Sequence, residues 1–145
     1  MTHVTIGQAT ESDYDIVEAL LEREHLPLAG LHDHLDNLLI ARDGFRIVGC
    51  AALELYDDDA LLRSVAVDAG HRGAGIGGDL TRAALQLAKQ RGVAAVYLLT
   101  MTAERFFPKF GFEVIDRADV PAAVKTSAEF AYACPSSAIV MRKVL

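Results

Sequence analysis

The feature that most constrains the fold is a cluster of glycines between an apolar run and a long amphipathic segment. The apolar run, residues 61–67, has the length and β-branched content of a buried strand. After it, apolar residues recur at helical spacing from 76 to 91, and Gly92 is placed to end that helix. The glycines between them, at positions 73, 75, 77 and 78, let a ligand approach the backbone closely. Their N–H groups would lie at the positive end of the helix dipole, which predicts a site for a phosphate or pyrophosphate.

The length and composition are those of a single folded domain. The chain has 145 residues, of which 52% are hydrophobic, so residues 1–145 can bury a substantial core. The two cysteines, Cys50 and Cys134, form neither a disulfide framework nor a zinc-ligand spacing. We therefore expect one domain that is held together by its core rather than by disulfides or a metal.

Net charge and the first residues narrow the range of partners. The formal net charge of −6 leaves no basic stripe for a phosphate backbone, so nucleic acid is not expected as a partner. Residues 1–5 lack the charged and apolar regions of a signal peptide. No apolar run approaches the roughly 20 residues of a membrane span. We expect a cytoplasmic protein that contacts no membrane.

Local patterns along the chain predict strands and helices in a definite order. Thr10 and Asp13 resemble a capping box at the start of a helix, and Asp43-Gly44 is a strong hairpin signal. Besides 61–67, strands are expected over residues 4–6, 38–42, 45–55, 93–100, 112–116 and 138–144. Shorter helices are expected over 28–37 and 103–110, and 117–137 is expected to be irregular, with a helical turn after Pro121. The predicted fold class is α/β, with a mixed, mostly antiparallel sheet and helices on both faces.

Two familiar phosphate-binding loops fit the glycine cluster poorly. A Walker A loop needs Gly-Lys followed by Ser or Thr, which this chain lacks. Gly73, Gly75 and Gly78 match the dinucleotide fingerprint, but the next strand, which ends at Leu99-Thr100, carries no acidic residue. A tight turn without any ligand is the structural alternative.

Two separated motifs resemble the GNAT superfamily of N-acetyltransferases. Val65-Ala66-Val67, followed by the run Arg-Gly-Ala-Gly-Ile-Gly over residues 72–77, is similar to motif A of that family. The run Phe-Phe-Pro-Lys-Phe-Gly-Phe, residues 106–112, resembles a second signature of the family. With the order of elements, the resemblance covers nearly the whole chain. It implies an acetyl-CoA-dependent N-acetyltransferase whose acceptor is a small-molecule amine.

The resemblance also implies how acetyl-CoA, the cosubstrate, would bind without a metal. The strand residues Val65, Ala66 and Val67 would pair with the pantetheine arm as though it were an added strand. Thr100 and Phe107 would lie beyond a gap between two strands. The backbone amides implied for the pyrophosphate are those of Arg72, Gly73, Ala74, Gly75, Ile76, Gly77 and Gly78.

The chain departs from the family at the expected general acid. The family often uses a tyrosine where this chain has Phe107, which cannot donate a proton. A water, Thr100, Thr102 or Tyr56 would then protonate the CoA thiolate. Glu54 alternates with Tyr56 on one strand face and is our candidate base for the acceptor amine. The alternative is that Glu54 simply faces solvent.

Finer likenesses within the family bear on the acceptor. The chain is similar to the acetyltransferase domain of N-acetylglutamate synthases and, more closely, to arsenic-resistance N-acetyltransferases. The first likeness is carried by residues 99–100, 106–107 and 111–112, and the second by residues 49–56, 61–67, 118–121 and 134–135. Both imply an acceptor, such as glutamate or a glutamate-like arsenical, with an α-amine beside a carboxylate.

Three residues are candidates for binding that acceptor. Arg63, with Ser64 beside it, would hold the carboxylate, or else form a salt bridge with the acidic turn at residues 57–59. Ser137 matches a substrate serine of the synthases, although their nearby arginine is missing here. That missing arginine puts glutamate itself in doubt.

Other polar residues have simpler interpretations. His32 and His34 suggest a metal site, but their spacing on a short helix favours a solvated stretch. Cys50 is expected in the core, and Cys134 either contacts the acceptor or is an ordinary buried thiol. A non-catalytic sensor of acetyl-CoA is the competing functional class, because the tyrosine is missing. The oligomeric state stays open, with a homodimer among the alternatives.

Overall fold

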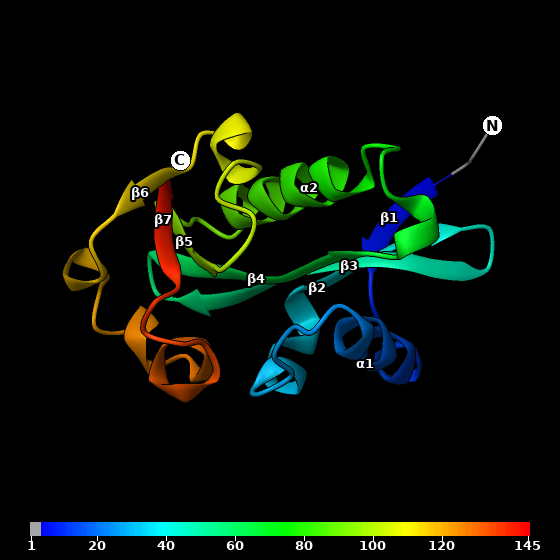
Figure 1. Ribbon diagram of the computed structural model, residues 1–145, viewed down its shortest axis with the longest axis horizontal. Helices are drawn as coiled ribbons and strands as arrows, with labels where there is room; N and C mark the ends of the chain where they lie inside the picture. Colours follow the sequence, from blue (N-terminus) through cyan, green and yellow to red (C-terminus); the bar gives the residue numbers. More distant parts are fainter. Residues whose placement is uncertain (1–3) are drawn as a thin grey trace.

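A computed structural model describes residues 4–145, which form one sheet with helices on both faces (Figure 1). The sheet has seven strands in the order β1-β2-β3-β4-β5-β7-β6. Within residues 4–145, β4 and β5 are the one parallel pair of neighbours. The strands are β1 (Val4–Gln8), β2 (Leu38–Asp43), β3 (Arg46–Tyr56), β4 (Asp59–Val67), β5 (Ala95–Thr100), β6 (Glu113–Ile115) and β7 (Ile139–Val144). The helices are α1 (Tyr14–Arg23) and α2 (Ile76–Gln90). This confirms the predicted mixed, mostly antiparallel α/β fold.

Local sequence signals set several of these boundaries. Thr10 and Asp13 form the predicted capping box, in which the Thr10 N–H donates to the Asp13 carboxylate at 2.8 Å. The hairpin between β2 and β3 turns at Gly44, which has a φ of 62°. Gly92 follows α2 with a φ of 77°, as expected for a residue that ends a helix in the left-handed conformation.

The two long helices cover opposite faces of the sheet, and each face has its own apolar cluster (Figure 1). On one face, α2 contributes Leu80, Ala84 and Ala88 to the larger cluster. On the other face, α1 places Val17 and Leu20 against β2 and β3. A third cluster lies where β5 and β7 meet the segment after β6. The sheet is therefore held rigidly on both sides, which suits it to position a site.

The close approach of α2 to the sheet depends on Gly49 in β3. A Cβ atom there would lie 2.9 Å from Leu80 Cδ1 and 3.0 Å from the carbonyl oxygen of Ala66. We expect Gly49→Ala to lower the free energy of unfolding by about 1–3 kcal/mol, the usual cost of overpacking. Urea denaturation checks this, with Gly7→Ala on β1 as the matched control, since nothing lies within 4 Å of its Cβ position. Equal stability of both variants would contradict the tight contact.

A β-bulge in β4 changes which face of the sheet the side chains after Arg63 point to. Cys50 is opposite Ala66 and Ala52 is opposite Arg63, so two residues of β4 face one of β3 between these pairs. The bulged residue Ser64 has a φ of 59°, and its carbonyl accepts a hydrogen bond from the Cys50 thiol at 3.1 Å. Leu62 and Val65 consequently both face the α2 side, although three positions apart in the strand.

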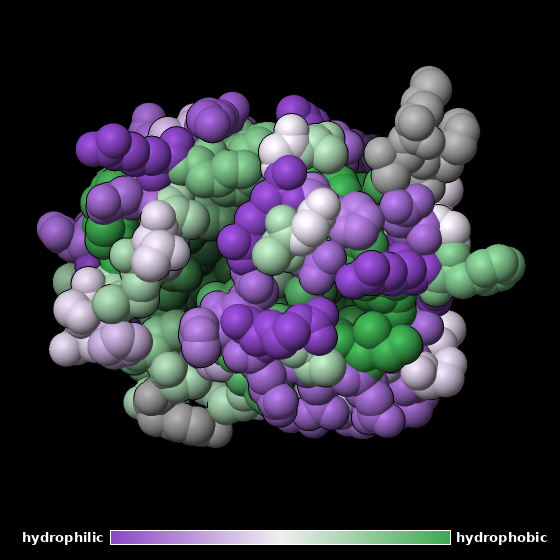
Figure 2. All heavy atoms as spheres, turned by 45° about the vertical axis from the view of Figure 1, so that its right-hand side comes forward, coloured by the Kyte–Doolittle hydropathy of each residue, from purple (hydrophilic) through white to green (hydrophobic). Residues whose placement is uncertain are grey.

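The parallel strands β4 and β5 separate soon after they meet. Their pairing covers residues 59–61 with residues 95–97 and stops there. The rest of β4 therefore presents backbone groups toward a gap rather than toward a neighbouring strand. In Figure 2 the molecule is hollowed left of centre, where apolar side chains line a recess with hydrophilic rims.

Two predicted segments differ in the structure. The expected helix over 103–110 is only a short helical turn, Phe107–Phe110, because Pro108 and Gly111 leave room for little more. The segment 117–137, expected to be irregular with a helical turn after Pro121, contains three short helical turns: Arg117–Asp119, Val124–Thr126 and Glu129–Ala133. The second of these is the predicted turn. Among the described residues no helix is both long and apolar enough to cross a membrane.

Candidate functional site

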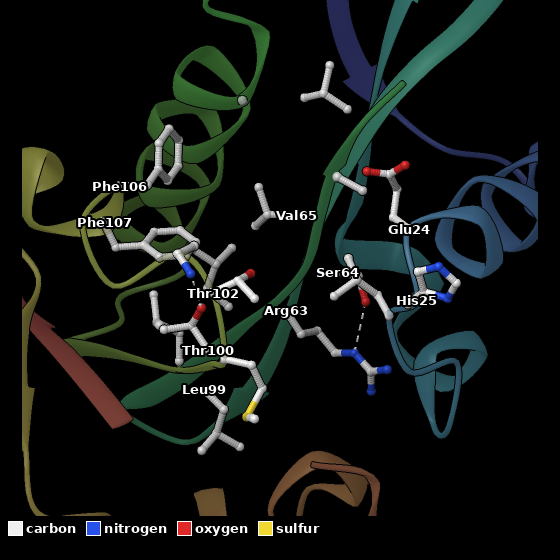
Figure 3. A pocket seen from close by; sticks show the side chains of 18 of the residues that line it. Glu24, His25, Arg63, Ser64, Val65, Leu99, Thr100, Thr102, Phe106 and Phe107 are labelled. Atoms are coloured by element: carbon white, nitrogen blue, oxygen red, sulfur yellow. Dashed lines mark hydrogen bonds between the residues drawn. The ribbon is translucent and has the colours of Figure 1, made fainter. Parts of the chain in front are cut away.

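The gap between β4 and β5 opens into a cavity of about 870 Å³. This volume is in the range of ligand-binding sites in proteins. Its walls come from the end of α1, the outer half of β4, the glycine loop, the end of β5 and residues 129–138. In Figure 3, Val65 points toward Phe106 and Phe107, whereas Arg63 points to the other side of β4, toward His25.

The glycine loop forms one end of the cavity. Gly73 and Gly75 have φ values of 86° and 82°, and at both positions a Cβ atom would have no neighbour within 4 Å. Gly75 is the N-cap of α2, so the first N–H groups of a 15-residue helix face this end. Such a helix N-terminus favours an anion. Of the predicted loop residues, Ala74 is exposed and outside the cavity lining, and the lining includes Arg72, Gly73, Gly75, Ile76, Gly77 and Gly78.

Charged side chains flank the glycine loop. Arg72 pairs with Glu24 at the end of α1, and both residues line the cavity. His71 lies between two carboxylates, with Nδ1 3.2 Å from Asp68 and Nε2 3.1 Å from Asp43. These pairs join the loop to α1 and to the β2–β3 hairpin, so the loop is held from both sides.

The middle of the cavity is bounded by the open edge of β4 and the end of β5. Val65, Ala66 and Val67, the strand residues implied for cosubstrate binding, line it on the β4 side. Thr100 lines it on the β5 side, and its hydroxyl oxygen accepts the Ala103 N–H at 2.9 Å. Because the Thr100 hydroxyl accepts this hydrogen bond, its own hydrogen does not take part in it. Phe107 also lines the cavity, with its ring edge-on to Phe106 and Phe112.

The opposite end of the cavity is organised by the buried side chain of Arg63, which is 2% exposed. Its Nη1 donates to Glu54 Oε2 at 2.8 Å and to the Ala29 carbonyl at 2.7 Å. Its Nη2 donates to the Pro27 carbonyl at 3.1 Å, and its Nε to the Ser64 hydroxyl at 3.1 Å. Arg63 therefore pairs with Glu54 rather than with the acidic turn at 57–59. A substrate carboxylate would have to replace one of these partners.

Glu54 and Tyr56 lie behind Arg63 and outside the cavity lining. Glu54 is 1% exposed, so it does not face solvent. The Tyr56 hydroxyl donates to Glu54 Oε1, which confirms that both side chains are on the same face of β3. Burial, followed by the neighbouring Glu54, raises the pKa of Tyr56 well above its usual range, so the phenol stays protonated. His34 Nε2 lies 3.6 Å from the same Glu54 oxygen.

A second carboxylate, Glu129, faces the same arginine from the turn Glu129–Ala133. Its Oε2 lies 3.4 Å from Arg63 Nε, and unlike Glu54 it lines the cavity. Burial raises the pKa of Glu129 to about 7; Glu54 adds to the rise, while Arg63 and the hydrogen bond from Cys134 oppose it. Cys134 also lines the cavity, and burial followed by Glu129 raises the pKa of its thiol to about 11.

The candidate residues identified from the sequence include Ser137, which lies outside the cavity lining, but not Glu129, which lines it. Glu129 lies in a segment without periodicity, far from either family motif, so no signal in the sequence marked it. Ser137 is exposed and outside the cavity lining, although Pro135 and Ala138 line it. His34 is not merely solvated, since it lies against Glu54. In residues 4–145 no three His, Cys, Asp or Glu side chains are grouped so that they could hold a metal ion.

Comparisons with known proteins agree with this geometry. Residues 34–114, more than half of the chain, match the acetyltransferase (GNAT) domain family. An amino-acid acetyltransferase of Pasteurella multocida is 35% identical over 127 residues, which are 81% of this chain and 29% of that protein. An amino-acid acetyltransferase of Mycobacterium tuberculosis is 39% identical over 80 residues, 54% of this chain and 45% of that protein. The chain thus spans less than half the length of either curated relative.

Solved structures show the same arrangement of elements. The N-acetylglutamate synthase of Neisseria gonorrhoeae, complexed with coenzyme A and N-acetyl-glutamate, has a TM-score of 0.85 at 21% identity. The alignment covers all of this chain and 36% of that one, and it shows a shared fold. A Mycobacterium tuberculosis protein in complex with CoA and NLQ has a TM-score of 0.83 at 27% identity, covering 97% of this chain and 99% of that one. The family match, the sheet that separates at β4 and β5, and the glycine loop lead to one conclusion: this chain belongs to the acetyltransferase (GNAT) family.

Proposed function

We propose that this protein transfers the acetyl group of acetyl-CoA to the α-amine of an amino-acid-like acceptor. The observation that carries the proposal is the cavity itself, which joins an anion-binding glycine loop, an open strand edge and a buried polar cluster in one continuous space. A linear cosubstrate with a pyrophosphate at one end and a thioester at the other fits that order. In this proposal the protein acts in the cytoplasm, and its acceptor is a small molecule.

Each part of the cavity has a role in the proposal. The amides at the start of α2 and the side chain of Arg72 bind the pyrophosphate. The unpartnered part of β4, with Val65 and Val67, pairs with the pantetheine arm as an added strand. Acetyl-CoA supplies an activated acyl carbon, and its thiolate is a tolerable leaving group because a thiol has a pKa near 8.5. Thr100, whose hydroxyl hydrogen is free to point into the cavity, is placed to hydrogen-bond that sulfur.

The acceptor class is supported by the relatives. Two proteins that are at least 35% identical to this chain over the aligned residues are named amino-acid acetyltransferase. The alignment covers only part of each of these proteins. The finer likeness to arsenic-resistance N-acetyltransferases adds glutamate-like arsenicals to the acceptors worth testing. Glutamate and such arsenicals share an α-amine beside a carboxylate, so the same end of the cavity would receive both.

Release of free thiol from acetyl-CoA is the direct test. The full chain is incubated with acetyl-CoA and a panel of amino acids, glutamate-like arsenicals and phosphinothricin-type analogues. We expect acceptor-dependent thiol release with at least one α-amino acid or analogue, and a product whose mass is higher by one acetyl group. Tight binding of acetyl-CoA without turnover on any acceptor would instead favour the sensor alternative. A protein that does not bind acetyl-CoA would refute the proposal.

A further inference from the structure

We propose that Glu129 is the catalytic residue that accepts a proton from the acceptor ammonium group. This inference rests on the proposed function and assigns the proton acceptor for the same reaction. Neither Glu54 nor a residue of β4 takes that role here. Three observations support the assignment: which of two glutamates lines the cavity, how charge is matched around Arg63, and how the backbone of Glu129 is held.

Only one of the two carboxylates around Arg63 faces the cavity. Both oxygens of Glu54 have partners, since Oε2 accepts from Arg63 and Oε1 from Tyr56, with His34 also near. Glu54 is absent from the cavity lining, and Arg63 lies between it and the open space. Glu129 lines the cavity together with Cys134 and Thr100. Glu129 is therefore the one of these two glutamates that borders the space in which the acceptor would bind.

The charges around Arg63 do not balance. Glu54 is 2.8 Å from Nη1, while Glu129 is 3.4 Å from Nε, so one guanidinium faces two buried carboxylates. Each of these three side chains is 5% exposed or less. A buried negative charge without a full partner is costly, and a proton or a bound cation relieves that cost. Glu129 is thus suited to receive an ammonium group and then to keep one of its protons.

Among the side chains that the structure describes, three from different elements act on the carboxylate of Glu129. Arg63 on β4 and Glu54 on β3 act on it through their charges, and the Cys134 thiol also lowers its pKa. The charge of Arg117 in turn lowers the pKa of the Cys134 thiol, although burial keeps that pKa above its usual value. The backbone around Glu129 is fixed, because its N–H donates to the Ser127 hydroxyl at 3.2 Å and its carbonyl accepts the Cys134 N–H at 3.0 Å. The backbone that carries the Glu129 side chain is therefore held in place, with the carboxylate 3.4 Å from Arg63 Nε.

The proposed step balances in atoms and charge. Glu129, as a carboxylate, takes one proton from R–NH₃⁺ and leaves a neutral amine with a free electron pair. That pair forms the C–N bond to the acetyl carbon, and the C–S bond breaks with its electrons on sulfur. The second nitrogen proton passes to the departing thiolate, directly or through the Thr100 hydroxyl. The products are R–NH–acetyl and CoA thiol, and the proton on Glu129 returns to solvent.

The test compares Glu129→Gln with Glu113→Gln, an exposed carboxylate on β6, in the full chain. With the best acceptor found for the wild type, we expect Glu129→Gln to lower kcat/KM by about 10²–10⁴-fold, the usual contribution of a general base. Glu113→Gln should leave it unchanged. The wild-type kcat/KM should rise with pH through about 7, where Glu129 loses its proton, and Glu129→Gln should lack that rise. At pH 8 Glu129→Gln should be as stable to urea as the wild type or more so, because it removes a buried charge.

Two further variants separate proton acceptance from a merely structural role. Cys134→Ala removes a thiol that lowers the pKa of Glu129, so the rising limb of the pH profile should move to higher pH. Cys134→Ser keeps a donor and should leave the limb near its original place. Carbon-13 NMR of glutamate-labelled protein, with the Glu129 signal assigned from its loss in Glu129→Gln, should show the same titration without any acceptor.

The outcomes distinguish this inference from the proposed function. Wild-type turnover together with an unchanged pH profile in Glu129→Gln would overturn the role of Glu129 and leave the acetyltransferase activity standing. The same holds if the Glu129 carbon signal titrates near pH 4. A wild type that binds acetyl-CoA but acetylates no acceptor would overturn both.

Discussion

Replacing Arg63 by alanine is expected to lower the free energy of unfolding by about 3–5 kcal/mol, the usual cost of removing one partner from a buried ion pair. The side chain is fully buried and contacts Glu54, Glu129 and the carbonyls of Pro27 and Ala29. Without it, two carboxylates would face each other inside the protein. Urea denaturation near pH 7.5 measures the loss, and the transition midpoint should fall accordingly.

A surface arginine provides the matched control for this prediction. Arg23 is 58% exposed on its side chain and lies 3.9 Å from Asp68, so Arg23→Ala should change stability by about 0.5 kcal/mol or less. The comparison also separates two roles of Arg63. If Arg63 served chiefly to bind a substrate carboxylate, Arg63→Ala would fold with nearly wild-type stability and show mainly a raised KM. That result would contradict the structural role argued from its contacts.

The parts of the fold that could be predicted are those with short-range signals. The capping box of Thr10 and Asp13, the turn at Gly44 and the left-handed Gly92 each depend on a few neighbouring residues. The glycine loop and α2 were predictable for the same reason, since strand, loop and helix follow one another directly. The glycine-loop end of the cavity could therefore be predicted from the chain alone.

The acceptor end could not be derived in this way. Alternation along β3 correctly placed Glu54 and Tyr56 on one face, but alternation alone does not say whether that face is buried. The answer depends on Arg63, whose position is set by pairing with β3 and by the bulge at Ser64. Glu129 is 66 residues away from Arg63 in sequence and lies in a segment that carries no periodic signal. Its place beside Arg63 follows from tertiary packing alone.

At the other end of the cavity, Gly75→Asp is expected to weaken acetyl-CoA binding by at least about 100-fold. The substitution would place a carboxylate where the proposed pyrophosphate meets the first amides of α2. Two like charges about 4 Å apart near a protein surface repel by about 4 kcal/mol, and about 2.7 kcal/mol already corresponds to 100-fold in Kd. Isothermal titration calorimetry of acetyl-CoA binding measures the effect.

Gly92→Asp separates this charge effect from backbone strain. Gly75 and Gly92 lie at opposite ends of α2 with φ values of 82° and 77°, and neither has an atom within 4 Å of its Cβ position. Both substitutions therefore carry the same left-handed strain, about 1–2 kcal/mol for an L-residue and less for aspartate. Only Gly75→Asp adds charge at the loop, so Gly92→Asp should bind acetyl-CoA like the wild type. It should lose more stability than Gly75→Asp, because a negative charge is unfavourable at the C-terminal end of a helix. If the two variants bound acetyl-CoA equally well, the glycine loop would not be the pyrophosphate site. A carboxylate placed in the loop would repel a pyrophosphate that was bound there.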